Sequence, residues 1–554
     1  MSGSDNIAAM WGTHFEQLLN SVDVDEVYMN ETKDKILNSA AAASATIVSP
    51  DEVRRAIRDL KKGSAAGPDG LSAEHFIYAP EQICVILSHM LSLCLTHGHL
   101  PDLMMKSFIV PLVKNKLGVL SDINNYRGIA ISSVISKIFE STLLIKCEDK
   151  LWSSDIQFGF KAGSSTHHAT FLLTEVLNYY RRNSSNVYSC FVDATKAFDR
   201  VNYWKLFNKL LLRGVDPNIV RILAFWYTNQ TMSVKWNNCF SASFYVRNGV
   251  RQGGKMSPFL FNVYVDDLLV AVHNVNAGCA IKGLLYNIIA FADDIVLFAP
   301  SVAGLRRLID CCVSEAKELD IKFNPSKSKC MLFPTSDKRF SLKGAPNPVI
   351  LLDGSPLKFV DEFPYLGHVM TPDLSDAKDI VRARRSLCKQ GNMIIHKFRK
   401  ASGAVKLCLF RSFCLGLFGC ELWDNSNANS LREISVMYHN IIKQIVDVPR
   451  HSHNHIICHD FRLLTFDKLI ASRQLNFLLN LKKSRNNLIT NIFHSIYPET
   501  KLYSSVNWIF NTFELNNLDL NQVNKWDIKR IFRCIVTCVA MNQYETIYNN
   551  FDND

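Results

Sequence analysis

Three aspartates at two places in the sequence have the surroundings expected of metal ligands. Phe191-Val192-Asp193 ends a short apolar run on an acid, and Ala292-Asp293-Asp294-Ile295 places two acids between two apolar runs. Magnesium prefers oxygen ligands, usually one or two carboxylates together with substrate phosphates and water. If the two segments are neighbouring strands of one sheet, the three carboxylates converge. They could then hold two divalent ions about 3.5–4 Å apart, an arrangement that catalyses nucleotidyl transfer.

A plainer interpretation of the acid pair stays open at this point. Two adjacent aspartates in a hairpin turn usually serve the turn and face solvent. The chain also contains a second acid pair, Asp266-Asp267, in an apolar setting. That pair follows Ser257-Pro258, which we expect to start a helix, and adjacent helical residues point about 100° apart. We therefore leave Asp266 and Asp267 out of the candidate site.

The composition is that of a folded chain with several domains or subdomains. Hydrophobic residues make up 48% and charged residues 20% of 554 residues, which excludes a largely disordered protein. The net charge of +11 fits contact with phosphate backbones, although many proteins without such a role are equally basic. No secretory signal is visible, and no apolar run approaches the ~18 residues of a membrane span. The 16 cysteines lack paired spacing and are expected to be reduced and mostly buried.

Periodicity and capping signals predict elements that place these acids in an α/β core. Ser49-Pro50-Asp51-Glu52 predicts a capped helix that stops near Lys62-Gly63, and Ser257-Pro258 predicts a second capped helix. The residues before the first helix suggest a helical lead-in, in which 39–46 is either a linker or a short helix. Other predicted elements are strands at 107–113, 188–194 and 331–333, a tight hairpin over 286–299, and helices at 202–213, 304–319 and beyond 376.

Several ordered motifs resemble those of the reverse transcriptases of non-LTR (LINE-type) retrotransposons. The three central ones are FVDATKAFDRV (191–201), GVRQGGKMSPFLFN (249–262) and AFADDIVLF (290–298). Further agreeing segments are GSAAGPDGLSAEHF (63–76), NNYRGIAISSVISKIFE (124–140), QFGFKAGSSTHHA (157–169), KFNPSKSKCMLF (322–333) and FPYLGHVM (363–370). The resemblance covers about 50 to 370, and more loosely extends to about 450. Agreement of many motifs in one order is far more specific than an acid pair alone.

The resemblance implies an α/β (α+β) fold with the right-hand arrangement of polymerases: fingers, a ferredoxin-like palm and a helical thumb. It predicts a lead-in over 1–48, fingers over 49–187 and a palm with part of the fingers over 188–375. A helical thumb would follow over 376–480, and no role is assigned to 481–554. The implied activity is RNA-directed DNA polymerase, which copies retrotransposon RNA into DNA by two-metal nucleotidyl transfer.

The resemblance also assigns roles to individual residues. Asp193, Asp293 and Asp294 would be the catalytic carboxylates that bind two Mg²⁺ or Mn²⁺ ions. The nucleotide-binding residues would be Lys114, Arg127, Ala194, Phe198, Gln252, Gly253 and Lys327. Lys114 and Arg127 would contact the triphosphate, the Ala194 carbonyl would add a metal ligand, and Phe198 would exclude a 2′-hydroxyl. Gln252 and Gly253 would border the nascent base pair, and Lys327, with Lys329 as its rival, would protonate pyrophosphate.

Contacts with nucleic acid are implied elsewhere in the chain. Tyr365, Leu366 and Gly367 would form the primer grip, although a plain hairpin is the alternative. The basic runs Arg382 to Arg385 and Lys397 to Lys400 would follow the backbone of an RNA–DNA hybrid, although a solvated helix face is the commoner role of such runs. The implied partners are an RNA template, a DNA primer and deoxynucleoside triphosphates, without a membrane. The sequence does not fix the oligomeric state.

Some features of the relatives have no counterpart in this sequence. Relatives often carry an endonuclease before the polymerase, and WGTHFEQLL resembles the linker that follows it, so we expect the polymerase region of a second open reading frame protein without that nuclease. His451, His453, His455, Cys458 and His459 lack zinc-knuckle spacing and are interpreted as loop residues. Cys534 and Cys538 lie one helical turn apart and are expected in a core.

Two alternatives to an active polymerase remain. One is a catalytically silent reverse-transcriptase-like scaffold that binds nucleic acid, which would be marked by broken metal ligands. The other is an orphaned remnant of an element. The three aspartates, Phe198, Arg127 and Gln252 stand intact, which favours the enzyme. The expected location is intracellular, with nucleus and cytoplasm both compatible with the sequence.

Overall fold

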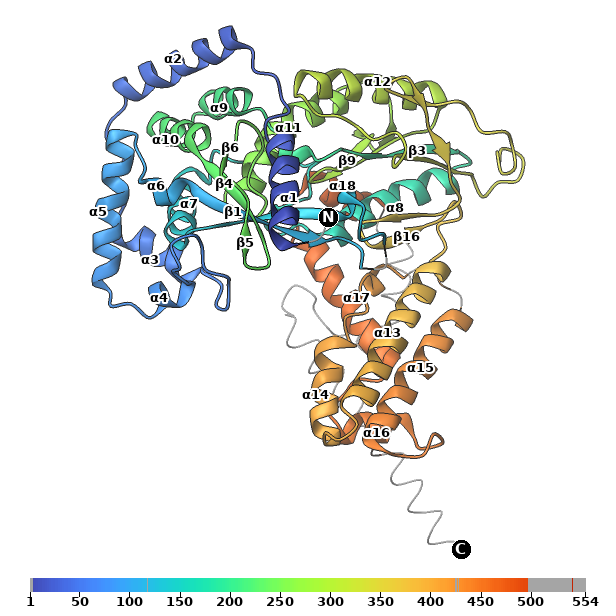
Figure 1. Cartoon of the computed structure of the whole chain (residues 1–554). Helices are drawn as coiled ribbons and strands as arrows, with labels where there is room; N and C mark the ends of the chain where they lie inside the picture. The colour runs from blue at the N-terminus through green and yellow to red at the C-terminus, as the bar shows by residue number, and fades with distance from the viewer. Residues whose placement is uncertain (1–2, 117, 424–425, 427, 497–540, 542–554) are drawn as a thin grey trace, which may run out of the picture.

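The computed structural model describes residues 3–116, 118–423, 426, 428–496 and 541, and these form a mixed α/β structure (Figure 1). Two sheets stand side by side, and a group of helices extends from the second. Within the described ranges, no helix is both long and apolar enough to cross a membrane.

The N-terminal sheet joins segments that are far apart in the sequence. Its strand order is β2-β1-β4-β5, with β6 also paired to β4. Strand β1 is antiparallel to β2 but parallel to β4, more than 100 residues further along the chain. The strands are β1 (Lys106–Val113), β2 (Tyr126–Ser132), β4 (Thr231–Trp236), β5 (Cys239–Phe240) and β6 (Phe244–Tyr245).

Helices surround this sheet, and the capping signals explain where one of them begins. Ser49 accepts a hydrogen bond from the Glu52 N–H at 3.2 Å, and Glu52 accepts one from the Ser49 N–H at 2.7 Å, so the predicted capping box is confirmed. The helix ends at Arg58, a few residues before the predicted Lys62. The helices of this part are α1 (Ser4–Leu18), α2 (Glu26–Ala42), α3 (Pro50–Arg58), α4 (Ala73–Ile77), α5 (Gln82–His97), α6 (Asp102–Met105) and α7 (Val134–Cys147), with the 3₁₀ turn η1 (Ile123–Asn125).

The central sheet has the order β14-β11-β3-β10-β9. Six of the seven residues of β3 are buried, because helices cover the sheet on both sides, with α12 and α8 on opposite faces (Figure 1). The strands are β3 (Val187–Asp193), β9 (Ile288–Phe291), β10 (Asp294–Ala299), β11 (Lys329–Phe333) and β14 (Lys358–Phe359). The helices are α8 (Thr166–Arg182), α9 (Tyr203–Leu212), α10 (Pro217–Asn229), α11 (Ser257–His273) and α12 (Val302–Glu318), with η2 (Ala197–Arg200). Small hairpins pair β7 (Cys279–Ile281) with β8 (Leu284–Tyr286), β12 (Leu351–Leu352) with β13 (Ser355–Pro356), and β15 (Phe363–Tyr365) with β16 (His368–Met370).

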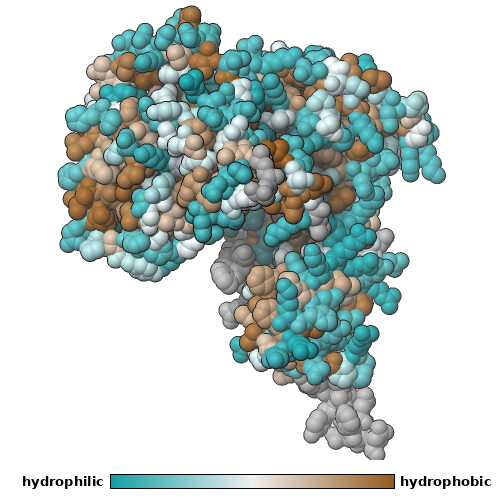
Figure 2. Space-filling view, in the orientation of Figure 1, coloured by the Kyte–Doolittle hydropathy of each residue, from teal (hydrophilic) through white to brown (hydrophobic). Residues whose placement is uncertain are grey.

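The C-terminal helices form a separate layer that projects from the sheets (Figure 1). Helix α13 packs against α14 and α15. Helix α17 packs against η3 and α18, and α18 packs on α8 beside the central sheet. Figure 2 shows both hydrophilic and apolar side chains on this layer, and a larger group of apolar side chains at the end of the molecule where α5 lies in Figure 1. Ile86 and Leu93 of α5 are exposed. The elements are α13 (Ala377–Lys397), α14 (Gly403–Phe413), η3 (Cys420–Leu422), α15 (Ala428–Val446), α16 (Asn454–Asp460), α17 (Phe466–Lys482) and α18 (Asn487–Ile496).

Some predictions about local structure are corrected. Ser257 is the first residue of α11 and Met256 occupies the cap position, so the predicted serine cap is wrong. Met256 already has helical backbone angles (φ −81°, ψ −25°), so Ser257 lies inside the helix and cannot cap it. His455, Cys458 and His459 lie on α16 and not in a loop. The described cysteines are free and mostly buried, as predicted. Cys534 and Cys538 fall outside the described residues.

Candidate active site

Asp193 and Asp294 are direct cross-strand partners. Asp193 is the last residue of β3 and Asp294 the first of β10, and the antiparallel register places them opposite each other. Side chains directly opposite in such a pair point to the same face, with Cβ atoms about 4.5–5.5 Å apart. The predicted convergence of these two carboxylates is therefore confirmed.

Asp293 belongs to the two-residue turn that joins β9 to β10. Its neighbour Ala292 has φ of 58°, which is left-handed backbone that costs a residue with a Cβ about 1–2 kcal/mol. The turn faces the same end of the sheet as Asp193, and electrostatic repulsion from Asp193 contributes to the raised pKa of Asp293. All three acids thus lie at one end of the central sheet.

The electrostatics of the three carboxylates are those of a cation site. Loss of solvation is the main cause that raises the pKa of each. The pKa of Asp294 rises to about 6, since Asp293 and Asp193 repel its negative charge as well. Arg127 opposes the rise at Asp293 and Asp294. Carboxylates that repel one another at one place are stabilised by a bound cation.

The donor set fits hard divalent ions, because it consists of carboxylate oxygens. Within the part of the chain that the structure describes, no group of three or more His, Cys, Asp or Glu side chains is arranged to hold a metal ion. Magnesium sites often use only one or two protein carboxylates and take their remaining ligands from substrate phosphates and water. The cross-strand pair Asp193 and Asp294 supplies that minimum.

Basic side chains gather around the acids. The pKa of Lys114 is lowered, first by burial and then by its cationic neighbours Arg127, Lys327 and Lys196. The Lys114 ammonium donates to the Asn124 carbonyl at 3.0 Å. Cations that crowd together while remaining charged suit a polyanion such as a triphosphate. Lys196 was not among the residues predicted from the sequence.

The segment before β11 braces the end of β3. The Ser328 hydroxyl accepts a hydrogen bond from the Asp193 N–H at 3.0 Å, and the Asn324 N–H donates to the Asp193 carbonyl at 2.9 Å. Ala194 lies opposite Phe323 in an isolated antiparallel bridge. These hydrogen bonds bring Lys327 close enough to Asp193 for its charge to oppose the rise in the pKa of that carboxyl. The structure thus places Ala194 and Lys327 beside the acids.

Phe198 is half-buried and held by aromatic contacts. Its ring stacks on Phe261 of α11, with centroids 4.2 Å apart and an angle of 13° between the rings, and meets Phe160 edge-on at 6.0 Å. The Phe198 carbonyl accepts a hydrogen bond from the Val250 N–H at 2.8 Å, which ties η2 to the loop before α11. The ring therefore has a fixed position near Asp193.

Gln252 and Gly253 link three elements at the site. The Gln252 carbonyl accepts the Ala130 N–H of β2 at 2.8 Å. Gly253 has φ of 121°, and a Cβ there would lie 2.7 Å from the Ala130 carbonyl oxygen, so this close approach requires glycine. The Gln252 amide donates to the Asp199 carboxylate at 2.8 Å.

Asp199 is, with Lys196, a residue of this site that the sequence interpretation missed. Burial raises its pKa to about 6, while the hydrogen bond from Gln252 and the charges of Lys196 and Lys114 oppose that rise. Asp293 also contributes to the increase. Its position directly after Phe198 was visible in the sequence, but its pairing with Gln252, 53 residues away, was not.

Leu366 and Gly367 form the turn between β15 and β16, and Tyr365 is the last residue of β15. Leu366 and Gly367 have φ of 47° and 83°, and a Cβ on Gly367 would lie 2.6 Å from the Phe418 ring of the C-terminal layer. Tyr365 is buried against Phe191 of β3, with ring centroids 5.4 Å apart. Asp294 contributes to the raised pKa of Tyr365, after burial, so this turn adjoins the carboxylates.

The second acid pair, Asp266 and Asp267, forms ion pairs with basic residues of the protein outside the candidate site. Asp266 forms an ion pair with Arg213 at 2.8 Å, and Asp267 forms one with Lys209 at 2.6 Å. Both acids lie on α11, as predicted. Part of the first basic run also makes contacts within the protein, since Arg382 pairs with Asp379 at 2.8 Å.

A buried charge network joins the β15–β16 hairpin to the C-terminal helices. His368 lies between Asp376 and Asp379, at 3.6 and 3.4 Å. Asp379 is fully buried and also accepts hydrogen bonds from Arg382 and from the Trp423 indole, both at 2.8 Å. Burial lowers the pKa of His368, but the two carboxylates outweigh this effect and raise it to about 9.

This network makes stability depend on pH. The folded pKa of His368 lies above the ordinary 6.5, so its contribution is complete below about pH 6.5 and is lost as the pH rises through 9. We expect His368→Asn to lower the free energy of unfolding most near pH 6.5, with a difference from wild type that shrinks by on the order of 3 kcal/mol by pH 9.5. Urea unfolding at several pH values measures this difference. A pH-independent difference would contradict the assignment of charge to His368.

Comparison with known proteins identifies the domain. Residues 113–370 match the family described as reverse transcriptase (RNA-dependent DNA polymerase). The chain is 24% identical over 315 residues to the Pol polyprotein of the R2DM element of Drosophila melanogaster, covering 55% of this chain and 28% of that protein. It is 26% identical over 291 residues to the TX1 transposon 149 kDa protein of Xenopus laevis, covering 52% and 22%. It is 22% identical over 426 residues to the RNA-directed DNA polymerase of the mobile element jockey of Drosophila funebris, covering 74% and 45%.

A solved structure of apo telomerase from Candida tropicalis aligns with a TM-score of 0.34 and 12% identity, over 52% of this chain and 59% of that one. The chain spans less than half the length of each of the three curated relatives.

The three aspartates at one end of the central sheet and the family match define the class: the chain carries a reverse transcriptase domain. Its relatives are non-LTR retrotransposon proteins, and the domain is distantly homologous to theirs.

Proposed function

We propose that the protein is an active RNA-directed DNA polymerase that copies retrotransposon RNA into DNA. The observation that carries the proposal is the cross-strand pair of Asp193 and Asp294 with Asp293 in the adjoining turn, surrounded by Lys114 and Arg127. Acids alone would suit any cation site. Acids facing a group of cations suit a substrate that brings both metal ions and a triphosphate.

In this proposal the two sheets and the helical layer correspond to the parts of a polymerase hand. The N-terminal sheet and its helices would be the fingers, the central sheet the palm, and the helices from α13 onward the thumb. Contact of the Gly367 turn with Phe418 would then place the primer grip at the junction of palm and thumb. Among the basic residues of α13 and its end, Arg385 and Lys397 to Lys400 remain candidates for the duplex backbone, whereas Arg382 pairs with Asp379.

The carboxylates would hold two Mg²⁺ or Mn²⁺ ions, which when bound make the primer 3′ hydroxyl more acidic and neutralise charge on the triphosphate. The primer 3′ hydroxyl would lose its proton to water as its oxygen bonds to the α-phosphorus of the deoxynucleotide. The bond from the α-phosphorus to the oxygen that bridges to the β-phosphate would break, and pyrophosphate would leave. Lys114 and Arg127 would bind the phosphates, and Lys327 would give a proton to the departing pyrophosphate. Gln252, held by Asp199, and Gly253 would border the base pair.

Phe198 is expected to set the choice of sugar. Its fixed ring would fill the space that a ribose 2′-hydroxyl needs, because Phe261 prevents it from moving aside. We expect Phe198→Ala to increase the use of ribonucleotides relative to deoxynucleotides by about 10- to 100-fold, a range that fits steric rejection worth about 1–3 kcal/mol. Steady-state incorporation of dTTP and UTP opposite adenine measures the ratio. An unchanged ratio would show that another group excludes the 2′-hydroxyl.

A catalytically silent scaffold is the alternative, and nucleotide binding separates the two. The enzyme is expected to bind a deoxynucleoside triphosphate much more tightly with Mn²⁺ than without it, whereas a scaffold would show no such dependence. Fluorescence titration of a labelled deoxynucleotide gives both affinities. Asp294→Asn should remove the metal dependence, and Asp267→Asn, on the outer side of α11, should retain it.

A further inference from the structure

Asp293 differs from the other two carboxylates because no strand ladder fixes it. Asp193 and Asp294 are held in register as the end residues of β3 and β10. Asp293 sits in the turn, so its direction depends on how the peptide groups of Ala292 are oriented, and Ala292 has left-handed backbone. A support outside the hairpin must hold this turn.

The buried side chain of Gln157 forms hydrogen bonds with both polar backbone groups of Ala292. The Ala292 N–H donates to Gln157 Oε1 at 2.8 Å, and Gln157 Nε2 donates to the Ala292 carbonyl at 3.2 Å. Gln157 Oε1 also accepts the Gly159 N–H at 2.8 Å. Gln157 is fully buried, so water does not compete for these bonds. A side chain that holds both groups of one residue restricts rotation of the adjoining peptides.

The backbone around Gln157 is itself paired with β9. Gln157 forms a parallel bridge with Ala290; the Ala290 N–H donates to the Ile156 carbonyl at 3.0 Å, and the Phe158 N–H donates to the Ala290 carbonyl at 2.8 Å. Gly159 then passes so close that a Cβ would lie 2.4 Å from the Ala292 nitrogen. These contacts hold Gln157 in a fixed register beside the turn between β9 and β10.

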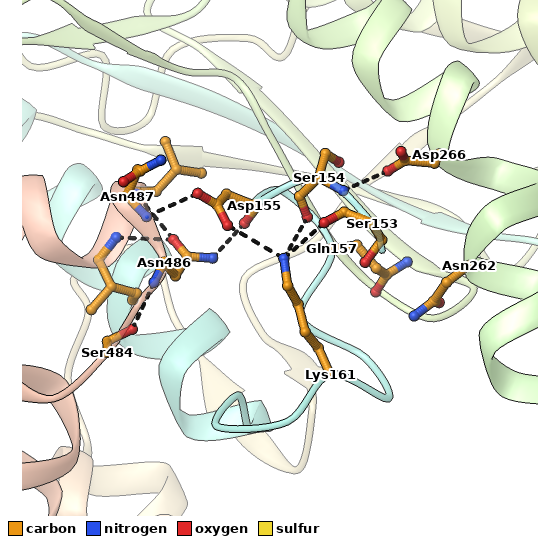
Figure 3. A network of polar contacts seen from close by, with 12 residues as sticks. Ser153, Ser154, Asp155, Gln157, Lys161, Asn262, Asp266, Ser484, Asn486 and Asn487 are labelled. Carbon is orange, nitrogen blue, oxygen red and sulfur yellow. Dashed lines mark hydrogen bonds and ion pairs between the residues drawn. The ribbon is translucent and has the colours of Figure 1, made fainter. Parts of the chain in front are cut away.

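The loop 153–161 that carries Gln157 is closed at its base by Lys161 (Figure 3). The Lys161 ammonium donates to the carbonyls of Ser153 and Ser154 at 2.9 and 3.1 Å and pairs with Asp155 at 3.3 Å. The Ser154 N–H donates to Asp266 of α11 at 2.8 Å. Asp266, which does not belong to the site, thus anchors the loop that reaches the site.

The same loop also anchors the start of α18. Asn486 Nδ2 donates to the Asp155 carbonyl at 2.6 Å, and the Asn487 N–H donates to the Asp155 carboxylate at 3.0 Å (Figure 3). Asn486 Oδ1 accepts the Leu488 N–H at 3.0 Å and caps the helix. The loop is therefore seated between α11 and α18, two elements more than 200 residues apart in the chain.

We propose that Gln157 is a positioning residue that sets the direction of the Asp293 carboxylate, and that the loop 153–161, seated on α11 and α18, holds it there. This inference rests on the proposed polymerase function. It assigns to Gln157 an effect on metal binding and turnover, in addition to its effect on folding. Misplacement of a reacting group by about 1 Å can cost about 100-fold in rate, so loss of this support is expected to be visible in kcat.

The test compares Gln157→Met with the matched variant Gln230→Met. Gln230 is also fully buried and its amide donates to the Tyr203 hydroxyl at 2.8 Å, away from the acids. Three properties are measured: hydrogen exchange of the 288–296 segment, Mn²⁺ affinity, and kcat and KM for a deoxynucleotide. For Gln157→Met we expect exchange about tenfold faster in 288–296, Mn²⁺ binding about tenfold weaker, and kcat lower by about 10- to 100-fold with KM within about twofold. For Gln230→Met we expect wild-type values in all three, even if its melting temperature falls equally.

Each outcome decides one claim. If the wild type binds Mn²⁺ and extends primers but the two variants behave alike, the positioning role of Gln157 is rejected and the polymerase function stands. If the wild type neither binds Mn²⁺ nor extends primers, the polymerase function fails. In that case hydrogen exchange alone decides whether Gln157 holds the turn: faster exchange in Gln157→Met retains that role, and equal exchange in both variants removes it.

Discussion

Asp193→Asn is expected to reduce primer extension by about 1000-fold or more. The change removes one negative charge from the cross-strand pair while keeping size and the hydrogen bonds of the backbone to Ser328 and Asn324. Loss of a carboxylate ligand removes several kcal/mol of transition-state stabilisation, and each 1.4 kcal/mol is about a factor of ten in rate. The folded state should not suffer, because loss of solvation raises the pKa of Asp193 and an uncharged amide avoids that cost. The substitution also removes the repulsion that Asp193 exerts on Asp293 and Asp294.

The measurement is the single-turnover rate of nucleotide addition, with the melting temperature recorded in parallel. Asp267→Asn is the matched control, because Asp267 is an aspartate on α11 that forms an ion pair with Lys209 and lies outside the candidate site. We expect the control to extend primers at the wild-type rate. A loss of similar size in both variants, or an Asp193→Asn variant that retains more than about a tenth of the rate, would contradict the metal-binding role.

Glu140→Gln is expected to destabilise the protein by about 3–5 kcal/mol. Glu140 of α7 and Arg251 form an ion pair at 2.7 Å in which both side chains are only 2% exposed. Glu140 also accepts the Lys255 N–H, so it supports the loop that carries Gln252 from both sides. Arg251 would remain buried over the Trp226 ring without a counter-charge, and an unpaired buried charge strongly lowers the free energy of unfolding.

Urea unfolding gives the change in free energy of unfolding. Asp353→Asn breaks the exposed ion pair with Lys317 and serves as the control, with an expected cost of about 1 kcal/mol or less. The double variant Glu140→Gln with Arg251→Met should recover part of the loss, since no unpaired charge stays buried. If Glu140→Gln costs no more than the control, the pair does not stabilise this loop.

The sequence predicted the parts of the fold that depend on local signals. Three features depend on only a few consecutive residues, and the structure confirms each of them. They are the capping box at Ser49 and Glu52, the strand that ends at Asp193 and the hairpin around Asp293. The convergence of Asp193 and Asp294 followed only on the assumption that their strands are neighbours. The predicted cap at Ser257 was wrong because helical backbone already begins at Met256, one residue before the local signal places it.

Contacts between distant segments could not be predicted in the same way. Periodicity does not reveal that β4 lies parallel to β1, or that α18 packs on α8. The hydrogen bonds from Gln252 to Asp199 and between Gln157 and Ala292 join residues 53 and 135 positions apart. Gln157 stood within a motif that resembles the family, but only the structure shows what its side chain holds.

The central claim is most directly tested by addition of one nucleotide to a DNA primer on an RNA template of defined sequence. Each of the four deoxynucleotides is supplied alone with Mg²⁺ or Mn²⁺ to the wild type and to Asp293→Asn. An RNA-directed DNA polymerase is expected to add only the nucleotide complementary to the template base, and the variant to add none at a measurable rate. Absence of extension by the folded wild type with either metal, or equal extension by Asp293→Asn, would contradict the proposed function.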